Sequence, residues 1–283
     1  MSEVPSDFLF TRYDARQGSV WLHRAFTMFM RARLSWTLLL LAYFVLMILV
    51  RLVPFLGSAL LSIAKPVFAV GLLAAAWTQE RGGMPTFGQL FQGFRANLVA
   101  LLPIGVFFLA GATIAMYGSA LVDGGKLVAF VTSDVRMSDE EIAAAFIDSG
   151  LQRGMLFSAL LMTPVLMATW WAPALVVFQD AKPGAALAAS LKAALGNWKP
   201  LIVYALTVFL FGAVMPGLFL GVAILILPAT IAAVLVPALL LPYLLFFTAT
   251  LHISDFVSYR DVFHAGETLA PLTARTATTS ARP

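Results

Sequence analysis

Cysteine is absent from this chain of 283 residues, and charged residues make up only 11% of it. The lack of cysteine excludes disulfides and thiolate chemistry, and the three histidines are isolated, without the spacing of metal ligands. A soluble globular domain carries about 25% charged residues. Because hydrophobic residues make up 61% here, the composition predicts an all-α protein embedded in a membrane. The missing cysteines and isolated histidines predict no cofactor and no redox or zinc role.

Six apolar stretches are long enough to cross a bilayer, for which about 20 residues suffice. The predicted spans are 34–53, 58–77, 98–122, 155–178, 200–222 and 230–253. One segment is ambiguous: residues 221–230 fit a helix, an outer turn or a re-entrant segment equally well. The sequence therefore predicts a polytopic protein with six transmembrane helices.

Lysine and arginine gather in the loops of one side, which hold 13 of the 18 basic residues. The loop between the third and fourth spans is acidic instead. Since cytoplasmic loops carry the basic excess, both termini are predicted to be cytoplasmic. The net charge of +4 then faces anionic phospholipid headgroups, and a nucleic-acid partner is not expected.

A segment recurs along the chain, because residues 77–101 align with 177–201 without a gap and pair Gln79 with Gln179 and Asn97 with Asn197. With a looser copy at the start, the pattern predicts three parallel helical hairpins, each preceded by an amphipathic interfacial helix. The predicted organisation is an N-terminal cytoplasmic segment 1–17, a membrane domain 18–256 with repeat units near 18–80, 86–180 and 184–256, and a largely disordered cytoplasmic tail 257–283.

The first of these surface helices has Trp21, Ala25 and Phe29 on one face and Arg24 and Arg31 on the other. This spacing is typical of an amphipathic helix. Basic residues opposite aromatic ones favour a helix lying in the membrane interface. The alternative is a cytoplasmic helix packed on protein.

The segment before the fifth span reads Ala188-Ala189-Ser190-Leu191-Lys192-Ala193-Ala194-Leu195-Gly196-Asn197. Around this repeat the chain resembles a broad group of uncharacterised proteobacterial multi-pass inner-membrane proteins. More distantly it is similar to membrane domains in which an A-x-x-L-K-x-A-L-x-N segment precedes a span. The resemblance implies location and architecture, and brings no activity or site residues with it.

A few side chains stand out against the apolar background. Lys65 is the one charged residue that falls inside a predicted span rather than at its edge. A cation there is costly and needs a partner, a cavity or a route to the surface. It either snorkels and packs structurally or contacts an anion or lipid phosphate. Trp170 and Trp171 precede Pro173 and either pack against a kink or wall a ligand pocket. His252 and Asp255 are predicted to be a surface pair.

In the loop between the third and fourth spans, Ser138 and Glu141 form a capping-box pattern, which predicts a short helix over 138–150.

No motif names a reaction, and no Asp, Glu or His lies in the middle of a predicted span, so an enzyme is not expected. The first hypothesis is a non-enzymatic membrane component that organises lipid or docks a protein partner through Arg24, Arg31 and Lys192. The alternative is a carrier of a lipid or small amphiphile with Lys65, Trp170 and Trp171 at its site. An interior cavity that reaches Lys65 would favour the carrier.

Overall fold

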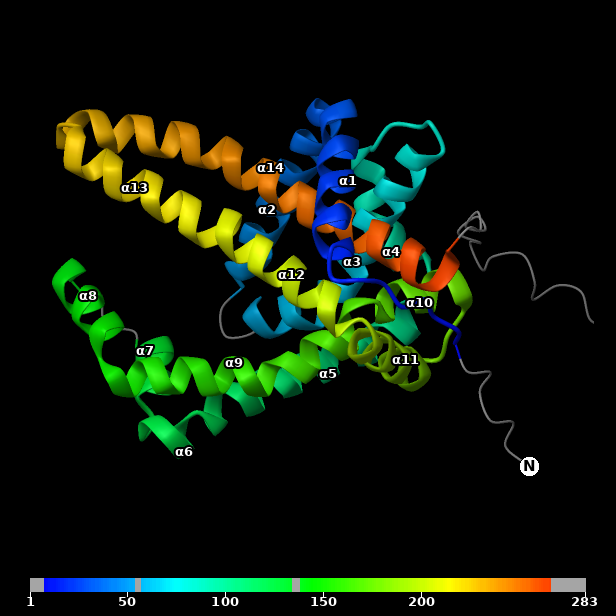
Figure 1. Ribbon diagram of the computed structural model, residues 1–283, viewed down its shortest axis with the longest axis horizontal. Helices are drawn as coiled ribbons and strands as arrows, with labels where there is room; N and C mark the ends of the chain where they lie inside the picture. The colour runs from blue at the N-terminus through cyan, green and yellow to red at the C-terminus, as the bar shows by residue number, and fades with distance from the viewer. Residues whose placement is uncertain (1–7, 54–56, 134–137, 266–283) are drawn as a thin grey trace, which may run out of the picture.

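The computed structural model describes residues 8–53, 57–133 and 138–265, and every regular element within these ranges is helical (Figure 1). The elements are α1 Gln17–Arg31, α2 Arg33–Arg51, α3 Gly57–Glu80, the 3-10 helix η1 Phe87–Phe91, α4 Gln92–Arg95, α5 Leu98–Gly118, α6 Ala120–Asp123, α7 Lys126–Thr132, α8 Asp139–Ile147, α9 Ser149–Trp170, α10 Ala172–Gln179, α11 Pro183–Gly196, α12 Trp198–Phe209, the π-helical turn η2 Leu210–Val214, α13 Met215–Ile226 and α14 Ala229–His264. The all-α prediction is confirmed.

Within the described ranges, six helical segments are long and apolar enough to cross a membrane, as predicted. They are Arg33–Arg51, Ala59–Glu80, Leu98–Asp123, Ser149–Gln179, Trp198–Ile226 and Ala229–His264. The fourth and sixth exceed the predicted spans, since they cover 31 and 36 residues.

The ambiguous segment 221–230 contains the short connection between two antiparallel helices. Helix α13 ends at Ile226, Leu227 and Pro228 are extended, and α14 begins at Ala229. Proline suits this position because a helix can start directly after it without needing its missing N–H. Figure 1 shows α13 and α14 lying side by side along their length.

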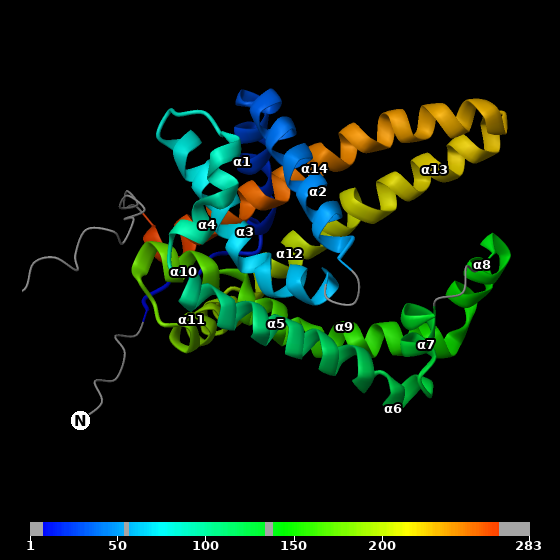
Figure 2. The ribbon, with the colours of Figure 1, turned by 180° about the vertical axis from the view of Figure 1, so that it is seen from behind.

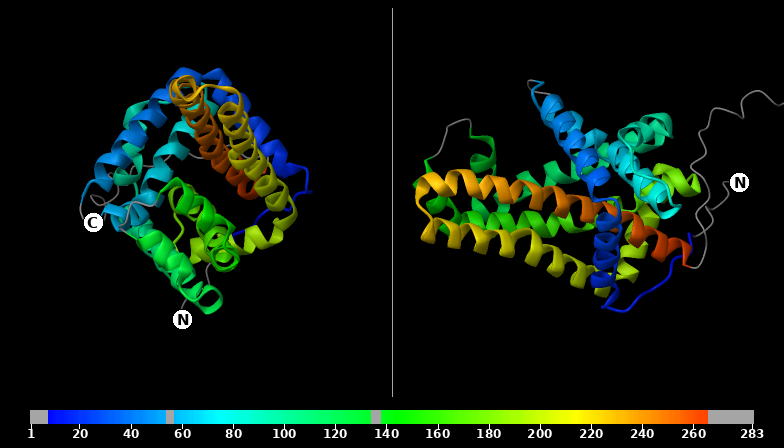
Figure 3. Two further views of the ribbon diagram at one scale, coloured as in Figure 1. Left: turned by 90° about the vertical axis from the view of Figure 1, so that its left-hand side faces the viewer. Right: turned by 90° about the horizontal axis from the view of Figure 1, so that it is seen from above.

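Three pairs of helices diverge from a common base, as the two opposite views and the end-on view show (Figures 2 and 3). We call these pairs the arms: α2 with α3, α5 with α9, and the α12–α13 segment with α14. The base is formed by α1, η1, α4, α10, α11 and the C-terminal end of α14. The largest fully buried side chains include Trp21, Trp171, Phe256 and Tyr259, all from the base.

Helix α1 packs on protein, which corrects the prediction that its apolar face lies in the lipid interface. Trp21, Ala25 and Phe29 are buried, and α1 lies against α14 and α12. A Cβ on Gly18 would lie 2.0 Å from the carbonyl oxygen of Pro200, so the first turn of α1 touches the backbone of α12 directly. Only glycine permits so close an approach.

Helix α14 continues past the predicted end of the membrane domain at 256, as far as His264. Val257, Tyr259 and Val262 are buried in the base. Residues 266–283, for which disorder is predicted, lie outside the described residues. The predicted threefold repeat stays a prediction.

The helix α8 begins as predicted. The Ser138 amide donates to the Glu141 carboxylate at 2.8 Å, and the Glu141 amide donates to the Ser138 hydroxyl at 3.2 Å. This reciprocal pair satisfies two amides that the first helical turn leaves without partners.

Candidate functional site

A cavity of about 360 Å³ lies where the three arms meet the base, and each of the six candidate spans contributes to its wall. Its polar lining consists of Tyr43, Lys65, Thr169, Trp170, Tyr204, Thr248, His252 and Asp255. Its apolar lining consists of Pro66, Ala69, Ile104, Phe108, Leu166, Pro173, Val208 and Leu251. A mostly apolar cavity with a few convergent polar groups is the usual form of a small-molecule site.

Lys65 forms one charged side of this cavity. It retains exposed surface there, although it lies in the middle of α3. Its ammonium nitrogen lies over the ring of Phe108 on α5, 4.1 Å from the ring centroid. Among the described residues no carboxylate forms an ion pair with it, so its partner inside the protein is an aromatic face. This placement differs from a side chain that snorkels away along its helix.

The position of Phe108 follows from a close contact between α3 and α5. A Cβ on Gly105 would lie 2.1 Å from the carbonyl oxygen of Ile63, so glycine is needed for the two backbones to touch. Gly105 lies three residues before Phe108, and Ile63 lies two residues before Lys65. Since residues one turn apart share a helix face, Phe108 lies on the face of α5 that touches α3. The Lys65 ammonium lies over its ring there.

His252 and Asp255 form the second charged side, which corrects the prediction of a surface pair. Both line the cavity from α14, and the His252 Nδ1 lies 3.6 Å from the Asp255 Oδ2. The sequence pattern missed them because the apolar run of the last span ends at Leu251, and the following polar residues looked like the end of the helix. In the structure α14 continues for more than three further turns.

The two tryptophans face different surroundings. Pro173 lies in the first turn of α10, and the helical path is broken between Trp170 and Ala172. Trp170 lines the cavity, and its Nε1 is buried without a hydrogen-bond partner among the described residues. Trp171 is fully buried in the core, where its Nε1 donates to the Ser258 hydroxyl at 3.0 Å. Only the first of the pair is therefore placed at the cavity.

Two tyrosines complete the polar wall. The Tyr204 hydroxyl hydrogen-bonds to the Ser254 hydroxyl at 2.8 Å, and its ring lies edge-on to Trp170 with centroids 5.0 Å apart. Tyr43 lies edge-on to His252, with centroids 6.1 Å apart. These contacts fix the rings of Trp170 and His252 at the cavity wall.

The three basic residues predicted to dock a partner lie on two different helices. Arg24 and Arg31 lie on α1 and Lys192 lies on α11. Arg24 donates to the Asp261 carboxylate at 2.9 Å, so part of its charge is already neutralised. Arg31 and Lys192 are exposed. Lys192 lines a separate groove of about 340 Å³, together with Phe10, Arg12, Leu195, Gly196 and Trp198.

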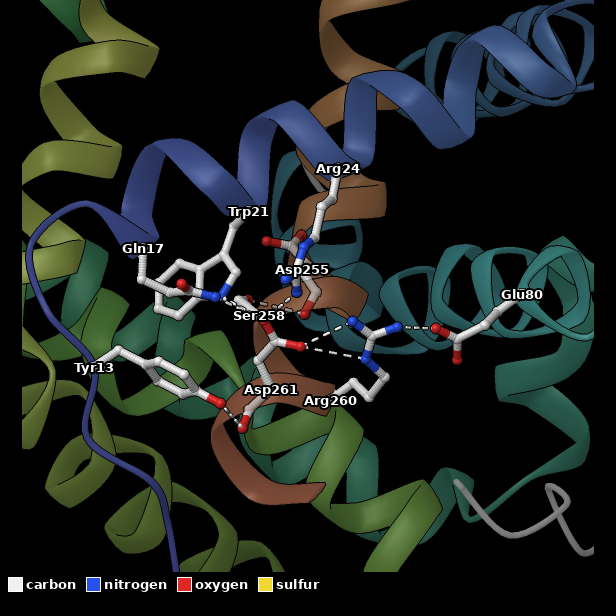
Figure 4. Close-up of polar contacts among 9 residues, drawn as sticks. All are labelled: Tyr13, Gln17, Trp21, Arg24, Glu80, Asp255, Ser258, Arg260 and Asp261. Atoms are coloured by element: carbon white, nitrogen blue, oxygen red, sulfur yellow. Dashed lines mark hydrogen bonds and ion pairs between the residues drawn. The ribbon is translucent and has the colours of Figure 1, made fainter. Parts of the chain in front are cut away.

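Asp261 is the centre of a polar cluster in the base that no sequence pattern indicated (Figure 4). Its carboxylate is almost buried and accepts hydrogen bonds from Gln17, Trp21 and Arg24 of α1 and from Arg260. Arg260 also forms an ion pair with Glu80 at the end of α3. The cluster thus fastens α1 and α3 to the C-terminal end of α14, a few residues beyond Asp255.

Comparison with known proteins agrees with the membrane architecture. The chain is 32% identical over 267 residues to a protein of Burkholderia thailandensis described as a "Probable inner membrane protein". The match covers 91% of this chain and 95% of the relative. The chain belongs to this family of inner membrane proteins. No family model matches the sequence, and no solved structure matches it.

Proposed function

We propose that this inner membrane protein is a non-enzymatic carrier that binds a lipid or small amphiphile, with the polar group of the ligand in the central cavity. The observation that supports the proposal is the cavity itself, which brings Lys65, His252 and Asp255 together with aromatic side chains from four of the six candidate spans. Charged groups at membrane depth are costly and usually mark a site for a ligand or an ion.

The wall of the cavity offers groups suited to an amphiphile. Lys65 can attract an anionic oxygen, and the indole N–H of Trp170 is a buried donor without a protein partner. A buried polar group of this kind costs free energy until an acceptor satisfies it. Phe108, Val208 and Leu251 supply apolar surface on the same wall.

Native mass spectrometry of the protein released from its own membrane tests the proposal. We expect a stoichiometric amphiphile on the wild type that is lost from Lys65→Met. The matched control is Lys199→Met, because Lys199 is an exposed lysine that lies over an aromatic ring, Trp198, outside the cavity. If the two variants and the wild type carry the same small molecules in the same amounts, the proposal is wrong.

A second function is favoured by the groove around Lys192. Arg12, Lys192 and Trp198 combine two cations with an indole ring, a combination that suits anionic headgroups at a membrane surface. With both termini cytoplasmic, as the loop charges favour, this groove would face the anionic inner leaflet and could organise lipid there or dock a partner. Charge reversal at Arg12 and Lys192 should then reduce binding to vesicles that contain phosphatidylglycerol, and should leave the ligand of the cavity in place.

A further inference from the structure

The central cavity carries two opposite charges on different helices. Lys65 comes from α3 and Asp255 from α14. Among the described residues each has only a weak partner. The ammonium of Lys65 rests on the Phe108 ring, and the carboxylate of Asp255 lies 3.6 Å from a histidine nitrogen. The two charges attract each other across the cavity, yet they do not close into an ion pair.

This arrangement restricts the ligands that the cavity can accept. An anionic group that approaches Lys65 also meets the negative field of Asp255, and a simple cation at Asp255 meets the field of Lys65. A site that places both signs together therefore selects by repulsion as well as by attraction.

We infer that the cavity binds a zwitterionic headgroup that carries both a phosphate and an ammonium group, as aminophospholipids do. This inference rests on the proposed function and names its ligand class. The phosphate lies at Lys65 and the indole N–H of Trp170, and the ammonium lies at Asp255, beside the rings of Tyr43 and Tyr204. Each protein charge then gains a partner of opposite sign.

The size of the cavity fits a lipid whose headgroup lies inside the cavity and whose acyl chains lie outside it. A volume of about 360 Å³ is near the lower end for small-molecule pockets. It accommodates a headgroup and leaves the acyl chains outside. The arms offer apolar surface for those chains. In each of the last two spans, only 6% of an 18-residue apolar stretch is buried inside the protein.

The experiment uses the full-length protein in nanodiscs of equal parts phosphatidylethanolamine and phosphatidylglycerol, followed by native mass spectrometry of the retained lipid. The variants are Lys65→Met, Asp255→Asn and Asp255→Glu, with Asp14→Asn as the control for loss of a carboxylate outside the cavity. Every variant is first checked for a single monodisperse species by size-exclusion chromatography.

We expect the wild type and Asp14→Asn to retain phosphatidylethanolamine in preference to phosphatidylglycerol. Loss of the carboxylate in Asp255→Asn should lower that preference about tenfold, which corresponds to roughly 1.4 kcal/mol. The Asp255→Glu variant restores the negative charge and should recover the preference. Lys65→Met should lose both lipids, because both bind through phosphate.

Two results would overturn the inference in different ways. Equal retention of the two lipids by the wild type, or a preference for phosphatidylglycerol, with both lost from Lys65→Met, would refute the zwitterionic ligand and leave the proposed binding function standing. Retention that does not differ between the wild type and Lys65→Met would refute both.

Discussion

Asp261 joins three parts of the chain through one carboxylate. It accepts hydrogen bonds from α1 through Gln17, Trp21 and Arg24, and its neighbour Arg260 extends the network to Glu80 on α3. Charge-assisted hydrogen bonds of this kind are about twice as strong as neutral ones. Because Asp255 lies six residues before Asp261 on the same helix, the network also fixes one wall of the cavity.

The Asp261→Ala variant should therefore unfold more easily. Breaking a buried ion pair by removing one partner costs about 3 to 5 kcal/mol. We expect about 3 kcal/mol, the low end, because the Arg24 side chain is 50% exposed and solvent screens its share. Thermal unfolding in detergent, followed by tryptophan fluorescence, measures the loss.

Asp14→Ala is the matched control, since Asp14 is exposed and its substitution should change stability by less than about 0.5 kcal/mol. Equal unfolding temperatures for the two variants would show that the cluster does not hold the base together.

The adjacent tryptophans give a second test on the scale of single residues. Trp171→Phe removes the hydrogen bond to Ser258 and should cost about 1 kcal/mol of stability without changing ligand retention. Trp170→Phe removes a donor that has no protein partner, so stability should hold while ligand retention falls. The unfolding temperature should fall only in Trp171→Phe, and the retained ligand, measured by native mass spectrometry, should fall only in Trp170→Phe. Identical behaviour of the two would contradict the assignment of only Trp170 to the cavity.

Helix α14 shows what the sequence could and could not predict on the scale of elements. Its apolar first part, up to Leu251, is long enough to cross a bilayer by itself and was recognised as a span. Its last part is buried through Ile253, Phe256 and Val257, with a spacing of three and four residues that is typical of a helix. Hydropathy alone overlooks this pattern because polar residues alternate with the apolar ones.

The cavity could be predicted only in part for the same reason. Lys65 stands alone in an apolar run, and its cost in a membrane makes it conspicuous. His252 and Asp255 carry no such signal at the edge of a span, and their pairing with Lys65 depends on how α3 and α14 pack. Trp170 and Trp171 are neighbours in sequence, so only the helix break before Pro173 decides which of them reaches the cavity.

The pair of Lys126 and Asp148 supports a prediction about α7. Hydrogen bonds from the Lys126 ammonium and from the Leu151 amide lower the pKa of Asp148 below its ordinary value. A carboxylate whose pKa is lower in the folded state than in the unfolded state stabilises the folded protein. This stabilisation is fully present when the pH is above the unfolded pKa, near 3.9. That stabilisation is lost as the pH falls through the lower folded value. Acid below about pH 4 should thus loosen α7 from α9.

Asp148→Asn imitates this protonation at neutral pH. We expect faster amide hydrogen exchange over residues 126–132 in this variant than in the wild type, because the contact that orders α7 is weakened. Glu140→Gln, an exposed acid on α8, should leave exchange in α7 unchanged. Unaltered exchange in Asp148→Asn would mean that α7 is held by its apolar contacts alone.

On the scale of the whole molecule, tight packing is confined to the base and the ends of the arms near it. For each span, the share of an 18-residue apolar stretch that is buried inside the protein measures this packing. The share is 56% for the second span, 17% for the first span and 6% for each of the last two. Protein interiors need contacts on all sides to exclude solvent, so lipid must cover most of the arms. The cavity lies at the junction of these two regions, where a ligand from the bilayer can reach charged groups held by the base.

Which side of the membrane the base faces decides which lipids its grooves can meet. Because the chain has no cysteine of its own, a single introduced cysteine can report that side. Single substitutions Asp14→Cys and Glu140→Cys place a thiol at exposed positions in the base and on α8 of the acidic loop. If the basic loops are cytoplasmic, a membrane-impermeant maleimide should label Glu140→Cys in cells with a permeabilised outer membrane and leave Asp14→Cys unlabelled. Both should react once detergent dissolves the membrane. Labelling of Asp14→Cys in intact inner membranes would reverse the orientation and place the groove around Lys192 on the outer leaflet, away from the anionic lipid that the second function requires.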